Sequence, residues 1–389
     1  MMLKLSKVVL VASLCSVMGA SSIMAKDISM GFDVFKELYN REENILISPF
    51  SISEALTLLE KGADGNTLKE LEAVLGGNPE LVNTIKENNT EALSQEESGV
   101  VNMDGGDAVI FKSANSLWLN KENGVKLLDS YDADGEVFER NFSEGVYEEV
   151  NEWVSEHTDN MINSILDKPL SGNMVLVNAL TFIGSWNEKF RDCGDMVFNG
   201  TLKEKEVPFM TDTLDDYWEV KGGGKIVKKS YVGYDYDFLM LLPPEGVELQ
   251  DYLAELSYKD ITKANRYKTF NDLVVIVRMP KFEFEYSASL VDYLKALGLK
   301  DCFSKLDADF SKLSDSPSYV DDILHKTYIE VDENGTRAAA VTADIMLAMG
   351  AQQRKQEIVE LNFDRPFLFI IGDTENHYPI FVGAVNNVG

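Results

Sequence analysis

Catalytic chemistry usually depends on histidine, cysteine or carboxylate side chains at characteristic spacings. The 389-residue chain has three histidines, His157, His325 and His377, and none lies in an HExxH or other metal-ligand pattern. Its cysteines lack zinc-site spacing, and the chain has neither a phosphate-binding GxxxxGK[ST] loop nor a GxSxG nucleophile turn. The 65 aspartates and glutamates are too numerous for one pair to stand out. We therefore predict a protein that is not an enzyme, needs no cofactor or metal, and uses its histidines structurally.

A run of small and β-branched residues near the C-terminal end is a second candidate for function. Glu333-Asn334-Gly335 is typical of a turn, and the residues Thr-Arg-Ala-Ala-Ala-Val-Thr-Ala follow at 336–343. In a strand, alternate side chains would face opposite ways. One face would then carry only small residues, namely Thr336, Ala338, Ala340 and Thr342. Such a segment could slide between two existing strands, although the pattern alone leaves an alanine-rich surface helix open.

The elements that must position these residues are unevenly distributed. Apolar spacing predicts helices at 31–39, 51–59, 67–76, 146–166 and 290–297. Strands are predicted at 44–47, 109–119, 174–186, 231–242, 273–284, 324–331, 367–371 and 380–385. Ser51 is the expected cap of the second helix, and the polar stretches 82–107 and 211–225 are expected to be loops. Helices early and strands late, without a linker or repeat, indicate one α+β domain with substantial antiparallel sheet.

Short motifs spread over most of the chain resemble the serpin family. They include Asn44 with the following ISPFS, ANSLWLN at 114–120, NALTFIGSWNEKF at 178–190, HKTYIEVDENGTRAAAVT at 325–342 and Arg365-Pro-Phe-Leu-Phe, in serpin order from about residue 30 onward. The chain departs from the family pattern at Ile183, where serpins usually carry lysine, and at Asn160-Met161. The resemblance implies the serpin fold: a large, mostly antiparallel central sheet, surrounding helices, and an exposed reactive-centre loop at about 333–360, within one domain of residues 26–389.

The resemblance also implies a mechanism. A serpin is a suicide-substrate inhibitor, because a protease that cuts its loop forms an acyl-enzyme, which is trapped when the loop inserts into the sheet. Here residues of about 335–348 would insert. The family's hinge falls on Glu333, Gly335, Thr336, Ala338, Ala339 and Ala340. Its shutter, a polar cluster beneath the point where the sheet opens, falls on Ser48, Ser51, Asn178 and His325. The alternative is a non-inhibitory serpin that serves as a binding or chaperone-like protein.

Two ways of counting place the scissile bond differently. Sixteen residues after Glu333, the family's usual spacing, comes Met349, followed by Gly350. Counting back from Pro366 with the usual loop length instead reaches Lys355, next to Arg354, because the loop is about six residues longer than usual. We prefer Met349–Gly350, which favours elastase-, chymotrypsin- or subtilisin-like serine proteases, with cysteine proteases also possible. Cleavage at Arg354 or Lys355 would favour trypsin-like proteases.

One residue of the loop does not suit insertion. The alternation that places Thr336 and Thr342 on the inserted face places Asp344 there too. An unpaired carboxylate in an apolar interior is costly. Asp344 must therefore find a partner, take up a proton, or limit insertion.

The N-terminus resembles a secretory signal peptide. Lys4 and Lys7 precede the largely apolar segment 8–17, and small residues follow as far as Ala25. We predict a signal peptide at 1–25 and a secreted protein, extracellular or periplasmic, since the apolar segment is short for a membrane span.

The charge and one further motif bear on partners and source. The net charge of −29 predicts no binding to nucleic acid, heparin or membranes, and a monomer is expected. Asn334-Gly335-Thr336 is a glycosylation sequon, and a glycan there would obstruct insertion. We therefore predict a host that does not glycosylate it, a bacterium. The sequence leaves open whether Cys193 and Cys302 pair.

Overall fold

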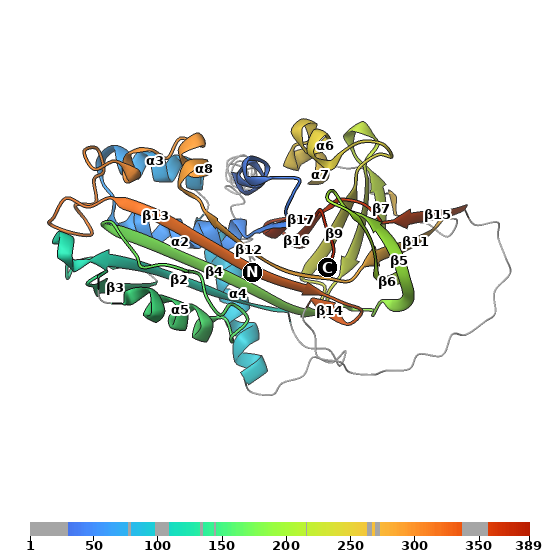
Figure 1. Cartoon of the computed structure of the whole chain (residues 1–389), viewed down its shortest axis with the longest axis horizontal. Coiled ribbons are helices and arrows are strands. Elements are labelled where there is room, and N and C mark those ends of the chain that lie inside the picture. The colour runs from blue at the N-terminus through green and yellow to red at the C-terminus, as the bar shows by residue number, and fades with distance from the viewer. Residues whose placement is uncertain are drawn as a thin grey trace, which may run out of the picture.

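A computed structural model describes residues 30–76, 79–97, 109–132, 135–143, 145–214, 216–262, 267–268, 273–336 and 357–389. Helices α3, α8, α6 and α7 lie along one side of the sheets, and α5 lies on the other side (Figure 1). The predicted signal peptide lies outside the described residues. So do nine of the loop residues singled out above, namely Ala338, Ala339, Ala340, Thr342, Asp344, Met349, Gly350, Arg354 and Lys355.

The largest strands form a six-stranded sheet, called here the central sheet. Its order is β12 (Phe282–Ser289), β13 (Val320–Val331), β14 (Gly335–Thr336), β4 (Met174–Ser185), β2 (Ile110–Asn120) and β3 (Glu136–Arg140). β13 and β4 pair directly and in parallel, from Val320 opposite Met174 to Tyr328 opposite Thr181. Beyond that point the short strand β14 lies between them. The central sheet is therefore closed along most of its middle and open at one end.

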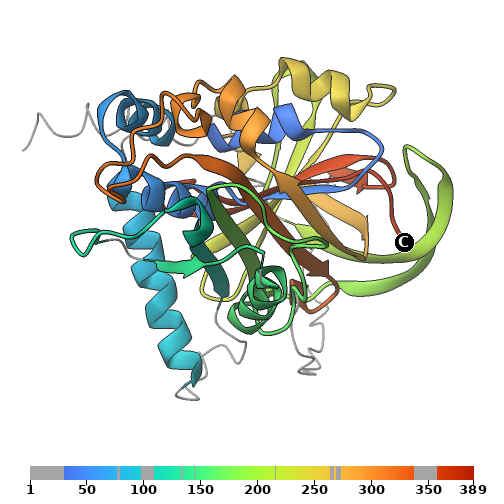
Figure 2. The ribbon, with the colours of Figure 1, turned by 60° about the vertical axis from the view of Figure 1, so that its left-hand side comes forward.

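Two further sheets complete the architecture. The seven-stranded sheet has the order β1 (Ile45–Ile47), β17 (Pro379–Val385), β16 (Phe367–Asp373), β9 (Tyr236–Leu242), β8 (Lys225–Ser230), β7 (Asp216–Glu219) and β10 (Tyr267–Lys268). The four-stranded sheet has the order β15 (Glu357–Asn362), β11 (Leu273–Pro280), β6 (Glu204–Leu214) and β5 (Arg191–Asn199), and its β5–β6 hairpin is long and curved (Figure 2). The predicted α+β class with a mostly antiparallel sheet is confirmed.

Helices cover the sheets and fill the space between them. Residues 30–38 are helical, followed by α2 (Pro49–Gly62), α3 (Gly65–Leu75), α4 (Pro79–Glu97), α5 (Val146–His157), α6 (Leu249–Glu255), α7 (Tyr258–Thr262) and α8 (Val291–Ala296). Short 3₁₀ turns occupy Lys121–Asn123, Lys221–Gly223 and Asp301–Phe303. α2 is buried on most of its surface, from Pro49 to Leu59, which makes it the internal helix on which the central sheet rests. In the described chain, no helix is long and apolar enough to cross a membrane.

Several sequence-based boundaries were wrong. Ser48, not Ser51, caps α2: its side chain accepts a hydrogen bond from the Ser51 main-chain N–H, and Pro49 occupies the first turn. The stretch 82–107 was expected to be a loop, but α4 extends to Glu97 and buries Leu81, Val82 and Ile85, an apolar stripe that its polar composition obscured.

Other boundaries moved for equally local reasons. The helix expected to reach residue 166 ends at His157, because Asp159 and Asn160 adopt positive φ angles of 50° and 60°. The strand expected at 273–284 divides at Lys281 into β11 and β12, which belong to different sheets. The stretch 211–225, expected to be a loop, contains the end of β6 and all of β7.

Candidate functional site

The open end of the central sheet is already occupied by the first residues of the loop segment. Gly335 lies opposite Ser185, and Thr336 lies opposite Gly184 on one side and Val331 on the other. A tight turn delivers them there: the Asp332 carboxylate accepts hydrogen bonds from the main-chain N–H groups of Asn334 at 2.7 Å and Gly335 at 3.1 Å. The chain therefore enters the sheet as a strand with a fixed register.

The Thr336 side chain fits a closed aromatic socket. It is 0% exposed, and its hydroxyl lies 2.7 Å from the phenol oxygen of Tyr231. The Tyr231 ring stacks on Trp186 with centroids 4.5 Å apart, and Phe182 lies beside it at 5.1 Å. Burial raises the pKa of Tyr231 well above its usual value, so the phenol keeps its proton for this hydrogen bond. We call this socket, made of Thr336, Tyr231, Trp186 and Phe182, the entrance.

Charged groups anchor the turn that precedes the entrance. Lys281 forms ion pairs with Glu333 and with Asp192, the latter at 3.3 Å. Lys189 donates a hydrogen bond to the side-chain oxygen of Asn334 at 3.0 Å. Glu333 is thus partly exposed, while Gly335 and Thr336 are buried.

The four residues predicted to form the shutter lie together beneath the closed part of the sheet. His325 on β13 lies directly opposite Asn178 on β4; His325 is bonded to Ser48, the N-cap of α2, and Asn178 to Ser51 in its first turn. All four are 0% exposed. We keep the name shutter cluster for Ser48, Ser51, Asn178 and His325.

The hydrogen bonds of the shutter cluster determine the state of its histidine. The Ser48 main-chain N–H donates to Nε2 of His325 at 3.2 Å, so the ring proton is on Nδ1, which donates to the side-chain oxygen of Asn178. Asn178 also accepts from the Ser51 hydroxyl and donates back to the Ser51 carbonyl, both at 3.0 Å. Burial lowers the pKa of His325 to about 3, so the ring is neutral. His325 therefore ties β13 to β4.

The polar network continues beyond the residues that the sequence singled out. Asn178 donates to the side-chain oxygen of Asn115 on β2. Asn115 in turn donates to the Ser113 hydroxyl at 2.8 Å and to the Glu54 carboxylate at 3.3 Å, and Ser113 donates to Glu54 at 2.7 Å. Burial raises the pKa of Glu54. A glutamate amid the apolar residues of a buried helix was the signal that the sequence offered for Glu54.

The remaining histidines and the two cysteines make packing and hydrogen-bond contacts with the rest of the fold. His157 stacks on Trp153 with centroids 4.3 Å apart, and the His377 carbonyl accepts a hydrogen bond from Tyr258. Cys193 and Cys302 are free thiols, and burial raises the pKa of both. Within the described ranges, no group of histidine, cysteine and acidic side chains could hold a metal ion.

Comparisons with known proteins agree with this geometry. The family described as serpin (serine protease inhibitor) matches residues 25–388. An uncharacterized serpin-like protein of Thermococcus kodakarensis is 31% identical over 376 residues, covering 92% of this chain and 84% of that protein. Intracellular coagulation inhibitor 2 of Tachypleus tridentatus is 30% identical, with coverages of 92% and 89%. The native structure of tengpin, a thermophilic serpin, is 28% identical, covers 94% of both chains and superimposes with a TM-score of 0.78. The chain belongs to the serpin family.

Proposed function

We propose that this serpin is a suicide-substrate inhibitor of serine proteases, with cysteine proteases as a second class. The observation that carries the proposal is strand β14, because Gly335 and Thr336 already lie between β13 and β4. A loop that has entered the sheet by two residues needs only to be released at its far end to continue. Cleavage by a protease would release it.

The register of β14 defines where later residues would go. Antiparallel partners advance in opposite directions, so with Thr336 opposite Gly184, Ala338 would lie opposite Phe182 and Ala340 opposite Leu180. These partners are 2% and 0% exposed, and alanines are among the few side chains small enough to enter there without repacking. Thr342 would arrive opposite Asn178 on one side and His325 on the other. The composition of the segment thus matches the positions it would take.

Insertion also has a favourable energy balance in this sheet. It would replace one parallel contact, between β13 and β4, with two antiparallel ladders, and parallel pairing is the weaker of the two. One additional strand adds about ten ladder bonds, each worth a net ~0.5–1.5 kcal/mol. That sum is comparable with the roughly 5–15 kcal/mol that keeps a protease folded. The inserted strand could therefore distort a protease still attached to it.

The scissile bond, secretion and the range of partners are parts of the same proposal. We propose Met349–Gly350 as the scissile bond, with Arg354 or Lys355 as alternatives, and residues 26–389 as the secreted domain. Secretion is supported by the N-terminal sequence alone, and one relative is named an intracellular inhibitor. The strong negative charge supports a monomer that does not bind heparin, nucleic acid or membranes.

A non-inhibitory binding protein is the second candidate, and Asp344 is the residue that favours it. In the register of β14, Asp344 would lie between Leu176 and Ile323, which are 0% and 1% exposed. A carboxylate between two buried aliphatic side chains opposes insertion at that point. Insertion that stopped before Asp344 would leave a protease free to complete hydrolysis.

The deciding experiment is incubation with elastase-, subtilisin- and trypsin-like proteases, followed by denaturing electrophoresis. An inhibitor gives an adduct that survives the detergent, because the acyl-enzyme is covalent. The same proteases with the catalytic serine replaced by alanine are the control and should give no adduct. Cleavage of the loop without an adduct would favour the non-inhibitory alternative. N-terminal sequencing of the released peptide identifies the scissile bond.

A further inference from the structure

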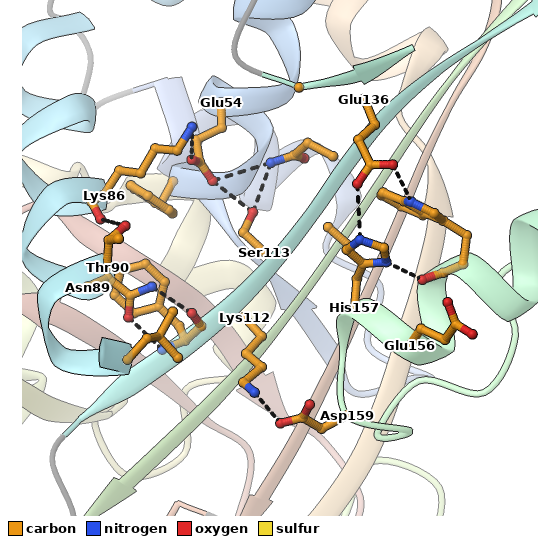
Figure 3. A pocket seen from close by; sticks show the side chains of 17 residues that line it. Glu54, Lys86, Asn89, Thr90, Lys112, Ser113, Glu136, Glu156, His157 and Asp159 are labelled. Atoms are coloured by element: carbon orange, nitrogen blue, oxygen red, sulfur yellow. Dashed lines mark hydrogen bonds and ion pairs between the residues drawn. The ribbon is translucent and has the colours of Figure 1, made fainter. Parts of the chain in front are cut away.

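A cavity of about 450 Å³ lies next to the shutter cluster, where α2, α4, β2 and α5 meet. Its labelled side chains fall into two groups in Figure 3. Glu54, Lys86 and Asn89 belong to the helices α2 and α4, whereas Glu136, His157 and Asp159 belong to β3, α5 and the segment after α5. The volume is within the range of small-molecule sites, roughly 300–1,000 Å³.

One buried carboxylate in this cavity has an unused oxygen. The Glu54 side chain is 9% exposed, and its Oε2 accepts the hydrogen bonds from Ser113 and Asn115. Its Oε1 receives no hydrogen bond from the described residues. The Lys86 ammonium lies 3.8 Å from it, beyond hydrogen-bond distance, and this lysine is 44% exposed. An ion pair so long and so solvated is weak and easily displaced. Oε1 of Glu54 is therefore available to a hydrogen-bond donor.

The lining favours a positively charged donor. Four carboxylates line the cavity, namely Glu54, Glu136, Glu156 and Asp159, against the two ammonium groups of Lys86 and Lys112 and the imidazole of His157, which is charged only when protonated. Lys112 is already paired with Asp159 at 2.5 Å, and Glu136 accepts hydrogen bonds from Trp153 and His157, both at 3.1 Å. Glu156 has no ion pair or hydrogen bond among the described residues. The potential in the cavity is therefore negative, and an incoming anion would meet it unfavourably.

The remaining lining gives the ligand an apolar body. Trp153, which is 8% exposed, contributes aromatic surface and Leu93 contributes aliphatic surface, whereas Phe50 and Phe111 are only 1% and 2% exposed. Aromatic faces also attract a cation placed above them. We propose that the cavity binds a small organic amine, with its ammonium group on Oε1 of Glu54 and its apolar part against Trp153 and Leu93.

Such a ligand would act on the sheet as well as on the cavity. A strand entering between β13 and β4 must separate them by about 4.8 Å, one strand spacing. β2 pairs with β4 over ten residues, and α5 packs on both strands, so these elements would shift together against α2. The cavity lies across that boundary, since its walls come from α2 and α4 on one side and from β2 and α5 on the other. A bound amine would therefore hold the sheet unexpanded, a consequence that rests on the proposed inhibitory function.

The test compares three probes of nearly equal shape by isothermal titration calorimetry with the intact protein. Phenethylamine carries the ammonium, 2-phenylethanol is its neutral counterpart, and 3-phenylpropionate is its anionic counterpart. We expect the amine to bind about tenfold or more tightly than the alcohol, since it gains a charge-assisted hydrogen bond, and the acid not to bind. Equal affinity of amine and alcohol would overturn the proposal.

Variants locate the site and guard against misfolding. Glu54→Gln should weaken amine binding about tenfold or more and leave binding of the alcohol unchanged. Glu156→Lys adds a positive charge at the exposed rim and should weaken the amine several-fold. Glu152→Lys is its matched control, one helical turn away on α5 and outside the cavity lining, and should have no effect. If the two lysine variants bind the amine equally, the site is not in this cavity.

The consequence for the sheet has a separate readout. The rate at which the protein gains heat stability after loop cleavage should fall when phenethylamine is present. In Glu54→Gln, adding phenethylamine should leave this rate unchanged. An unchanged rate at saturating amine would reject the coupling. A failure of the untreated protein to gain stability at all would reject the proposed inhibitory function instead, and the calorimetry would still report on the cavity.

Discussion

The entrance and the shutter cluster are both buried parts of the same sheet, yet they are held in opposite ways. At the entrance the loop is already inside, and a single hydroxyl pair between Thr336 and Tyr231 satisfies the polar atoms. At the shutter cluster, β13 pairs directly with β4 and is tied to it through His325 and Asn178. At the entrance, β13 and β4 are thus already separated and β14 lies between them, whereas in the middle of the sheet the two strands pair directly. Under the proposed mechanism, the main resistance to insertion therefore lies in the middle of the sheet.

The loop sequence reflects this difference. If the register of β14 continued along the loop, its two threonines would meet the two polar places: Thr336 already occupies the entrance, and Thr342 would reach the shutter cluster. A hydroxyl can accept one hydrogen bond while it donates another. Thr342 could accept from Nδ1 of His325 and donate to Asn178, and so replace the bond it interrupts. Between the entrance and the shutter cluster, Ala338 and Ala340 would lie opposite the apolar side chains of Phe182 and Leu180.

The largest expected effect is at the entrance, where Thr336→Arg would block the first step. A guanidinium cannot enter a fully buried aromatic socket without losing its hydration, so the loop would stay outside. We expect the yield of detergent-stable adduct to fall by more than about tenfold, with the loop cleaved as a substrate instead.

Thr213→Arg is the matched control for this change, because Thr213 is an exposed threonine on β6. It should leave the adduct yield unchanged. If Thr336→Arg still traps protease normally, the entrance does not control insertion and the contrast between the two regions fails.

The sequence predicted parts of these regions and missed others, for physical reasons. The hinge and shutter residues were assigned from motifs that resemble serpins, and the folded chain does bring Ser48, Ser51, Asn178 and His325 together. The extension to Asn115 and Glu54 could not be located in this way, because it depends on contacts between α2 and β2 that only the folded chain brings together. Individual strands were predicted well, but the division at Lys281 was not, since two strands that continue each other in sequence can join different sheets.

Asp344 provides the next largest effect. If it inserts between Leu176 and Ile323, its carboxyl must take up a proton, which costs at most about 4 kcal/mol at neutral pH. Asp344→Ala should therefore stabilise the cleaved form by up to that amount and raise the adduct yield. Melting temperatures of the intact and cleaved forms measure the change, and the intact form should not respond. Equal stability of the two cleaved proteins would mean that insertion stops before residue 344.

The shutter cluster should give the intact protein a strong sensitivity to acid. Because burial lowers the pKa of His325 to about 3, the neutral ring contributes stability above the unfolded-state pKa near 6.5. That contribution is lost as the pH falls toward 3. Between pH 7 and pH 4 we expect a loss of about 3 kcal/mol in the free energy of unfolding.

Chemical denaturation of the intact protein at several pH values measures this loss. His325→Gln should flatten the dependence, since no group that titrates in this range remains in the cluster. His157→Gln is the matched control, because His157 is a histidine outside the shutter cluster, and the loss of stability carried by His325 should persist in it. An identical slope in His325→Gln and in the unmodified protein would show that the histidine does not carry the effect.

The smallest effect tests the replacement of one bond by another. Thr342→Val keeps the shape of the side chain but removes the hydroxyl, so after insertion the Nδ1 proton of His325 and the side-chain oxygen of Asn178 would each lose a partner. We expect the cleaved form to lose about 1–3 kcal/mol, the usual cost of unsatisfied buried polar groups, while the intact form keeps its direct bond and its stability. The difference between the melting temperatures of the two forms isolates this step. A loss in the intact form as well would mean that Thr342 already contributes before cleavage, and the middle of the sheet would then not be closed by His325 and Asn178 alone.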